Sequence, residues 1–250
     1  MSPGLLLLLA ASTLAPPRDT LRILLVVDDT TARATLVRGI SLGAEEAART
    51  GALFGMSVQL RIAQARDAAD ASRAITASFG DARPALVIAA GSEAACDTVG
   101  AITARDSTPL LDAGCAASDA QRTPAAYSLG VPAADSAAGD STRVVLWHWT
   151  LDRFGGEQLN ERYRRRFADR MDSAAWAGWL AAKISLDLAL HARSVAAPAL
   201  LRELASPRAR FDGQKGRPLW FGATDRRLVQ PTYRVAGHGD AEHVVAEVAP

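Results

Sequence analysis

The chain has 250 residues, of which 22% are charged and 49% are hydrophobic, and 28 basic residues against 27 acidic ones leave a net charge of +1. This profile is typical of a globular protein and excludes intrinsic disorder and fibrous classes. A charge near zero, with acids and bases interleaved along the chain, also argues against a nucleic-acid partner, because phosphate binding needs a concentrated basic face.

An apolar run from Leu5 to Leu14 opens the chain, and Ala15-Pro16-Pro17 follows it. The run is too short to span a bilayer and has the length of the hydrophobic core of a secretory signal. We therefore interpret residues 1–15 as a signal peptide, although the usual basic segment before the run is missing. A buried N-terminal strand or helix is the alternative. Export predicts a periplasmic location for the mature chain.

From Leu21 onward, apolar runs and helical patterns alternate along the chain. Continuous apolar strands between helices are typical of βαβ units, in which a parallel sheet is covered on both faces. The expected fold class is therefore α/β, with an open doubly wound parallel sheet. Strands are expected at 21–27, 57–62, 85–90 and 109–112, and helices at 31–50, 65–79 and 93–104.

The alternation breaks after Gly114, where small and polar residues predominate apart from a candidate strand at 126–131. Turn residues around short aromatic segments at 211–235 predict a small C-terminal β-hairpin. Before this hairpin, a strand is expected at 143–149 and helices at 156–167, 173–191 and 197–205. The helix at 173–191 is expected to pack flat on the sheet. The predicted organisation is a first α/β lobe at 18–131, a linker at 132–142, a strand and helices returning to the same lobe at 143–206, and the hairpin and tail at 207–250.

Open parallel sheets bind ligands at the carboxyl ends of their strands. Asp28 and Asp29 are interpreted as helix-capping and cleft-edge carboxylates, with a metal pair as the alternative. His148 and Trp149 stand at the end of a later expected strand, where they would add an imidazole and an aromatic wall; a partly buried structural histidine is the alternative for His148. The candidate ligand-binding residues are Asp28, Asp29, Gly91, Ser92, Asp112, Ala113, His148 and Trp149.

Cys96 and Cys115 are the two cysteines of the chain, and in an exported protein such a pair is a disulfide candidate. Cys96 falls in the first turns of the helix after the strand at 85–90, and Cys115 falls just past the strand at 109–112. If these strands are neighbours, the geometry allows a bridge, unless the helix points Cys96 away. Such a bridge would brace the loops of the sheet edge rather than perform chemistry.

Other motifs do not support catalysis or metal binding. The four histidines are dispersed, and no pair has the spacing of a helical zinc site, so no metal is expected. The string from Gly39 to Gly43 satisfies the G-x-S-x-G pattern of α/β-hydrolases around Ser41. It lies inside a helical pattern, however, and not at the strand-to-helix turn that exposes a nucleophile. We therefore expect no enzyme activity and no cofactor.

Two sets of strings resemble known families. In the C-terminal half, Trp147-His148-Trp149-Thr150 and the segments 158–167, 175–183, 211–219 and 230–233 resemble the substrate-binding proteins of ABC transporters linked to pyrroloquinoline-quinone-dependent alcohol oxidation. In the N-terminal half, Gly39 and the string from Gly43 to Ala47 resemble the first-helix pattern of type I periplasmic receptors, which include branched-chain amino acid receptors.

The resemblance implies a type I periplasmic binding fold, a small organic solute as ligand, an ABC permease as partner, and a link to a quinone-dependent dehydrogenase system. One departure stands out: the chain passes from Val131 to Arg143 where most of a second lobe is expected, so the linker replaces most of that lobe. A single-lobe protein-interaction or sensory subunit of the same system, without solute trapping, is therefore the alternative function.

Overall fold

The computed structural model of the chain describes residues 19–28, 31–115, 123–130 and 142–250. The predicted signal peptide, Asp29 and nearly all of the predicted linker lie outside these described residues.

Five parallel strands form the central sheet in the order β2-β1-β3-β4-β5. The middle strands are buried along their length, which is why they read as continuous apolar runs rather than as alternating patterns. The open parallel sheet predicted from the sequence is confirmed. Its strands are β1 (Asp19–Val27), β2 (Met56–Gln64), β3 (Leu86–Ala90), β4 (Leu110–Asp112) and β5 (Ala126–Ser128).

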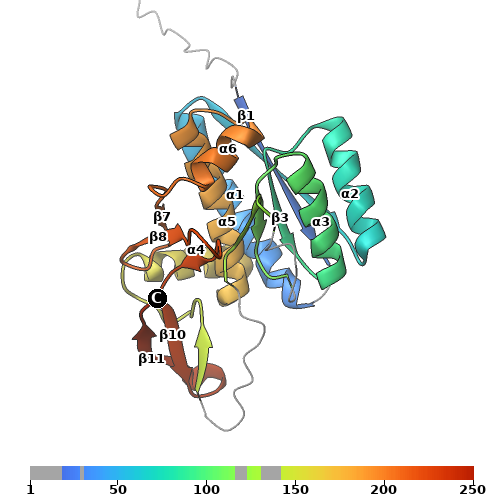
Figure 1. Ribbon diagram of the computed structural model, residues 1–250. Helices are drawn as coiled ribbons and strands as arrows, with labels where there is room; N and C mark the ends of the chain where they lie inside the picture. Colours follow the sequence, from blue (N-terminus) through green and yellow to red (C-terminus); the bar gives the residue numbers. More distant parts are fainter. Residues whose placement is uncertain (1–18, 29–30, 116–122, 131–141) are drawn as a thin grey trace, which may run out of the picture.

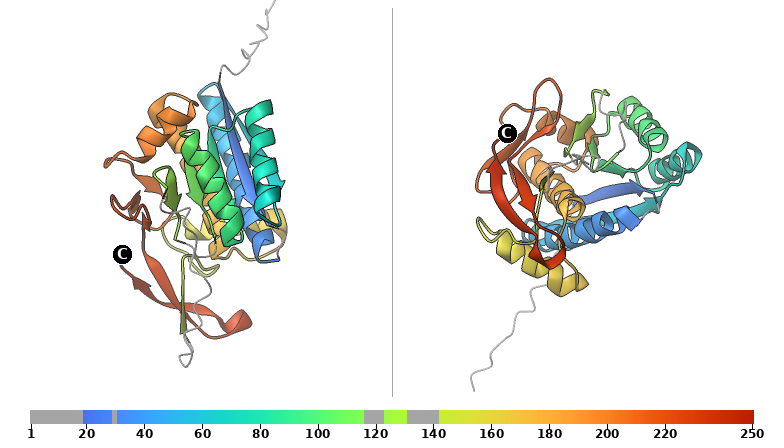
Figure 2. Two further views of the ribbon diagram at one scale, coloured as in Figure 1. Left: turned by 45° about the vertical axis from the view of Figure 1, so that its right-hand side comes forward. Right: turned by 90° about the horizontal axis from the view of Figure 1, so that it is seen from below.

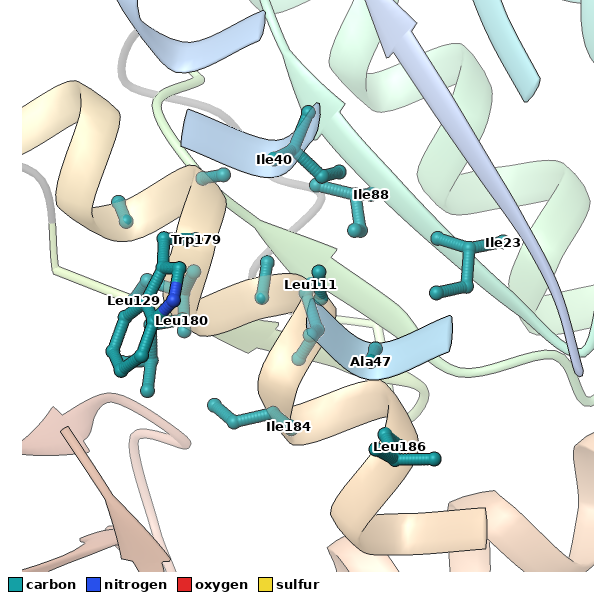
Figure 3. Packing of buried hydrophobic residues seen from close by; sticks show 14 of the residues in the cluster. Ile23, Ile40, Ala47, Ile88, Leu111, Leu129, Trp179, Leu180, Ile184 and Leu186 are labelled. Atoms are coloured by element: carbon teal, nitrogen blue, oxygen red, sulfur yellow. The ribbon is translucent and has the colours of Figure 1, made fainter. Parts of the chain in front are cut away.

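Helices cover both faces of this sheet (Figures 1 and 2). Alternate residues of β1 belong to two separate core clusters, because successive side chains of a strand point to opposite faces. Ile23 faces the cluster shown in Figure 3, and Leu24 faces the other. The first face carries α1 (Thr31–Leu53) and α5 (Ser173–Ala192), and the second carries α2 (Ala68–Asp81) and α3 (Glu93–Arg105).

Glycines let α1 and α5 pack with their backbones in contact. A Cβ atom placed on Gly39 would lie 1.8 Å from the carbonyl oxygen of Ala175, and one on Gly178 would lie 2.4 Å from that of Leu36. Ser41, between the glycines of the G-x-S-x-G pattern, donates its hydroxyl hydrogen to the carbonyl oxygen of Val37. The pattern therefore forms a helix-packing notch, consistent with the helical interpretation made from the sequence.

Two further helices complete the body. They are α4 (Gly156–Phe167), which lies against α1, and α6 (Ala197–Leu204), which lies against α5. Within the described residues no single helix is long and apolar enough to cross a membrane; α5 and α6 pass that test only together, across a bend of 100°. The apolar composition of α5 follows from its place in the core, since thirteen of its twenty residues are buried.

The second half departs from the prediction in its strands. The strand expected at 143–149 is β6 (Thr142–Val145), which pairs with β10 (Thr232–Ala236) and not with the central sheet. It ends at Val145 because the next two amides donate instead to the hydroxyl of Ser173, at 3.0 and 3.3 Å. The return of this strand to the first lobe, as predicted, is therefore wrong.

The predicted C-terminal hairpin is divided between two small antiparallel sheets. β7 (Phe211–Asp212), β8 (Pro218–Phe221) and β9 (Leu228–Val229) form one of them, whereas β10 pairs with β11 (His243–Val248), a strand that the sequence analysis did not predict. We call the sheet β11-β10-β6 the projecting sheet, because it extends from the body at the end toward which β1 points (Figures 1 and 2).

The contact between α1 and α5 generates a stability prediction. Gly178→Ala should lower the free energy of unfolding by about 1–3 kcal/mol, because the new methyl group meets backbone atoms that cannot turn away. Gly80→Ala is the matched control, since a Cβ atom there has nothing within 4 Å and alanine is the better helix former by roughly 0.5–1 kcal/mol. Urea unfolding of both variants measures the difference, and equal midpoints would contradict the backbone contact.

Candidate functional site

The carboxyl ends of β1, β3 and β4 bring several predicted residues together. The amide of Asp28 donates to the carbonyl oxygen of Ala90 at 3.3 Å, and a Cβ atom on Gly91 would lie 3.4 Å from Asp28 Oδ2. The amide of Ala113 donates to the carbonyl oxygen of Ala89 at 2.9 Å. Asp28, Gly91 and Ala113 therefore lie on neighbouring strand ends, which we call the strand-end site.

Arg33 is the cation of the strand-end site, and the sequence analysis missed it. It stands in the first turn of α1, and its Nε lies 3.4 Å from Asp28 Oδ1. Its Nη1 fills the space beside Gly114, where a Cβ atom would lie only 2.6 Å away. Nε is buried and has no hydrogen-bond acceptor among the described residues. The signal that could have found Arg33 is its place in the first turn of a helix that begins at the sheet edge.

Two other predicted residues shape the loops of this edge. The Ser92 hydroxyl caps α3 by accepting a hydrogen bond from the amide of Ala95 at 3.5 Å, and Ser92 itself is exposed. Asp112 is buried, and its Oδ1 accepts hydrogen bonds from the amides of Gly114 and Cys115 at 2.9 and 2.8 Å. That oxygen of Asp112 therefore holds the turn that admits Arg33.

Cys96 and Cys115 are joined by a disulfide, with their Cα atoms 6.1 Å apart. Cys96 lies one turn into α3 and Cys115 follows the turn held by Asp112. The bond ties the start of α3 to the loop after β4 and so braces one side of the strand-end site.

His148 and Trp149 are grouped elsewhere, beside the projecting sheet. His148 is 3% exposed, and its Nδ1 and Nε2 lie 2.8 Å from Thr150 Oγ1 and 3.4 Å from Glu242 Oε2. Burial lowers the pKa of His148, and the neighbouring Glu242 only partly offsets this. The guanidinium carbon of Arg170 lies 4.0 Å from the ring centre of Trp149. These contacts favour the structural interpretation of His148.

A cavity of about 890 Å³ opens beside Trp149 and the exposed side of α4. Its charges balance, because four arginines and four carboxylates line it and several pair with each other or with α1. Arg162 binds Glu46 of α1 at 2.7 Å, and Arg164 and Arg165 both pair with Glu161. The cavity therefore offers no surplus charge, and none of the strand-end residues lines it. The described residues also contain no cluster of three or more metal-ligating side chains.

Comparisons with known proteins point to one fold. No model of a known protein family matches the sequence, and no curated protein matches it. The leucine-binding protein LivK of Thermotoga maritima has a TM-score of 0.72 at 10% identity, covering 92% of this chain and 99% of that chain. A periplasmic binding protein of Burkholderia mallei has a TM-score of 0.75 at 11% identity, covering 92% and 95%.

This chain has the type I periplasmic binding protein fold. A third neighbour with this fold is the solute-binding protein of an ABC transporter from R. palustris, solved in complex with benzoate, with a TM-score of 0.72 at 13% identity over 92% of this chain and 97% of that one. All three neighbours are described as binding proteins. At such identities the likeness establishes the fold alone.

The disulfide leads to a second prediction. Replacing Cys96 and Cys115 together by serine should lower the free energy of unfolding by about 3 kcal/mol, the loop-closure value for a separation of 19 residues. Urea unfolding in the absence and presence of a reductant measures it. The reduced wild type should unfold at the same urea concentration as the double variant. A wild type whose unfolding midpoint does not change with reductant would contradict the structural role of the disulfide.

A third prediction concerns pH. Because the pKa of His148 is lowered in the fold, the unfolded chain takes up a proton at about pH 6.5 that the folded chain still excludes. Stability should therefore fall as pH drops below that value, by up to about 1.4 kcal/mol per pH unit. His148→Gln should remove this part of the acid destabilisation, and the exposed His191→Gln should not. Urea unfolding at pH 7 and pH 5 measures the loss of stability. An equal loss in the wild type and in both variants would contradict the prediction.

Proposed function

We propose that this chain is the periplasmic solute-binding component of an ABC-type uptake system, with an ABC permease as its partner. The shared fold with ABC transporter binding proteins supports this role. The C-terminal strings support the finer assignment to a system associated with quinone-dependent alcohol oxidation. Binding is non-covalent in this proposal and needs neither a cofactor nor a catalytic residue.

Arg33 is the observation on which the proposed binding site depends. Its guanidinium is paired with Asp28 at 3.4 Å, but Nε has no hydrogen-bond acceptor among the described residues, and a buried donor in that state is costly unless a partner satisfies it. Here that nitrogen lies at the strand ends, where open α/β sheets bind ligands. Gly91 is buried against the carboxylate of Asp28, and the exposed Ser92 follows it.

The chemistry of this group favours a small organic acid as the solute. A carboxylate accepts charge-assisted hydrogen bonds from a guanidinium in paired geometry. The neighbour from R. palustris was solved with benzoate, which is such an acid. Acids are also the end products of alcohol oxidation, so this ligand class agrees with the resemblance of the C-terminal half.

The alternative function, a single-lobe interaction or sensory subunit, has support of its own. The described residues contain a single parallel sheet, and residues 132–142 stand where the resemblance places most of a second lobe. The projecting sheet also exposes Val144, Val245 and Val248, with relative exposures of 37%, 48% and 37%. Exposed apolar surface of this kind is typical of an interface. Concentration-dependent self-association in sedimentation experiments would favour this alternative.

A thermal-shift screen distinguishes the two functions. The mature protein is heated with short alcohols, their carboxylic acids, amino acids and pyrroloquinoline quinone. A bound acid at about 100 times its Kd should raise the melting temperature by roughly 5–10 °C. Arg33→Gln should abolish the shift, whereas Arg105→Gln, which replaces an exposed arginine of α3, should keep it. A cooperative melt that no compound shifts would contradict solute binding.

A further inference from the structure

The two edges of the central sheet differ in how far they are protected. β5, at one edge, has three residues, and the amide of Ser128 donates to the carbonyl oxygen of Arg226 at 2.9 Å, which covers that edge. β2, at the other edge, has nine residues and pairs with β1 alone within the described residues. It contains no proline, no break in its register with β1 and one charged residue, Arg61. Edge strands with so little protection can pair with another chain.

The backbone of β2 determines which groups stand at this free edge. The amide of Ala65 donates to the carbonyl oxygen of Val27 in β1 at 2.8 Å, so the odd-numbered residues of β2 direct their backbone groups toward β1. Neighbouring residues of a strand direct these groups to opposite sides. The outward N–H and C=O groups therefore belong to Met56, Val58, Leu60, Ile62 and Gln64.

These outward groups are complementary to those of an identical strand. In an antiparallel pair with Leu60 opposite Leu60 of a second copy, Val58 lies opposite Ile62 of that copy and Met56 opposite its Gln64. Residues opposite each other in this phase exchange two hydrogen bonds. A two-fold axis through Leu60 therefore leaves no outward residue of β2 without a partner, which is the pattern of an interface between identical surfaces.

The side chains of β2 agree with the same pairing. Val58 and Leu60 are partly buried against the core on the face of α1, and Ile62, two residues further on that face, is 41% exposed. Pairing about Leu60 joins these three side chains to their equivalents in one apolar strip. On the other face, Gln59 lies opposite Arg61 of the second copy, so no two like charges stand directly opposite each other.

The turn before β2 supplies a second observation. Leu53 and Phe54 are 83% and 66% exposed. Phe54 stands as far before Leu60 as Arg66 stands after it, so antiparallel pairing brings Phe54 to the end of the second copy's β2, near the exposed Arg66 of that copy. An aromatic ring attracts a guanidinium, and the apolar side chains lose their contact with water.

We propose that β2 is the docking edge for a second copy of this chain, paired antiparallel about Leu60, so that the two central sheets become one continuous sheet. This proposal goes beyond solute binding. None of the strand-end residues lies in β2, and the projecting sheet takes no part, so each copy keeps its own binding site.

Cysteine cross-linking tests the register directly. Cys96 and Cys115 are the two cysteines of the chain and are bonded to each other, so an added cysteine supplies the free thiol. Gln59 and Arg61 are both exposed, which makes their replacement compatible with folding. Under mild oxidation, a mixture of Gln59→Cys and Arg61→Cys should form a covalent dimer at least about tenfold faster than either variant alone, because only the mixture places one thiol opposite another. No covalent dimer in the mixture, or equal rates in a single variant, would overturn the proposal.

Sedimentation tests the interface without cross-links. The wild type should change from monomer to dimer as its concentration rises, because a dimer forms by mass action. Ile62→Lys should raise the dissociation constant of the dimer at least about tenfold, since the apolar strip loses one side chain from each copy. Val245→Lys, at an exposed residue of the projecting sheet, is the matched control and should leave that constant unchanged.

The remaining outcomes separate this interface from the other roles of the chain. A wild type that stays monomeric at every concentration would overturn the proposal. Association that Val245→Lys abolishes and Ile62→Lys leaves intact would also overturn it, because the contact would then lie on the projecting sheet. A thermal shift produced by a carboxylic acid should be the same in Ile62→Lys as in the wild type, so loss of the dimer and loss of solute binding are told apart.

Discussion

The backbone contact between α1 and α5 is the constraint on which the rest of the structure depends. Gly39, Gly43 and Gly178 remove the side chains that would otherwise separate the two helices. α1 begins where β1 ends, and α5 begins at Ser173, whose hydroxyl binds the chain just after β6. Because the two helices run side by side from these starting points, their contact sets the position of the strand-end site relative to the base of the projecting sheet.

Helix α5 also supports the junction through its aromatic residues. Trp176 donates to the carbonyl oxygen of Gly213, stacks on Trp147 and lies beneath the amine of Lys215. Trp179 donates to Glu46 of α1 at 2.9 Å, so the same helix is bound on its other side. A displacement of α5 would therefore disturb the core and the contacts of Lys215 together.

The parts of the fold that were predictable are those in which burial and periodicity carry the same information. β3 is apolar because both of its faces are covered, and the helix at 156–167 has the predicted bounds because its buried residues recur at helical spacing. The strand expected at 143–149 ends at Val145, because Trp147 and His148 are buried for a different reason. Trp147 packs on Trp176 and donates to Asn160, which are tertiary contacts that no local pattern records.

The strand-end rule placed Asp28, Gly91 and Ala113 together, since it follows from the topology of a parallel sheet. The same rule did not predict what each residue at the strand ends does. That Asp112 holds a turn depends on amides beyond the strand, and that Arg33 reaches Gly114 depends on two segments about eighty residues apart in the sequence, which only the folded sheet brings together. Their roles as ligand contacts stay predictions.

Two basic side chains stand in different surroundings: Arg33 is partly exposed and paired with Asp28, whereas Lys215 is buried without an ion pair among the described residues. At the strand ends, Asp28 Oδ1 faces Arg33 Nε at 3.4 Å without a hydrogen bond to it. Lys215 can lose its proton, and the carbonyl oxygens and rings around it accept a neutral amine. A guanidinium suits the recognition of a carboxylate, whereas burial of a lysine favours its neutral form. Exchanging the two residue types would bury an arginine without a counter-charge beside Gln230 and Trp176, where its charge would be costly.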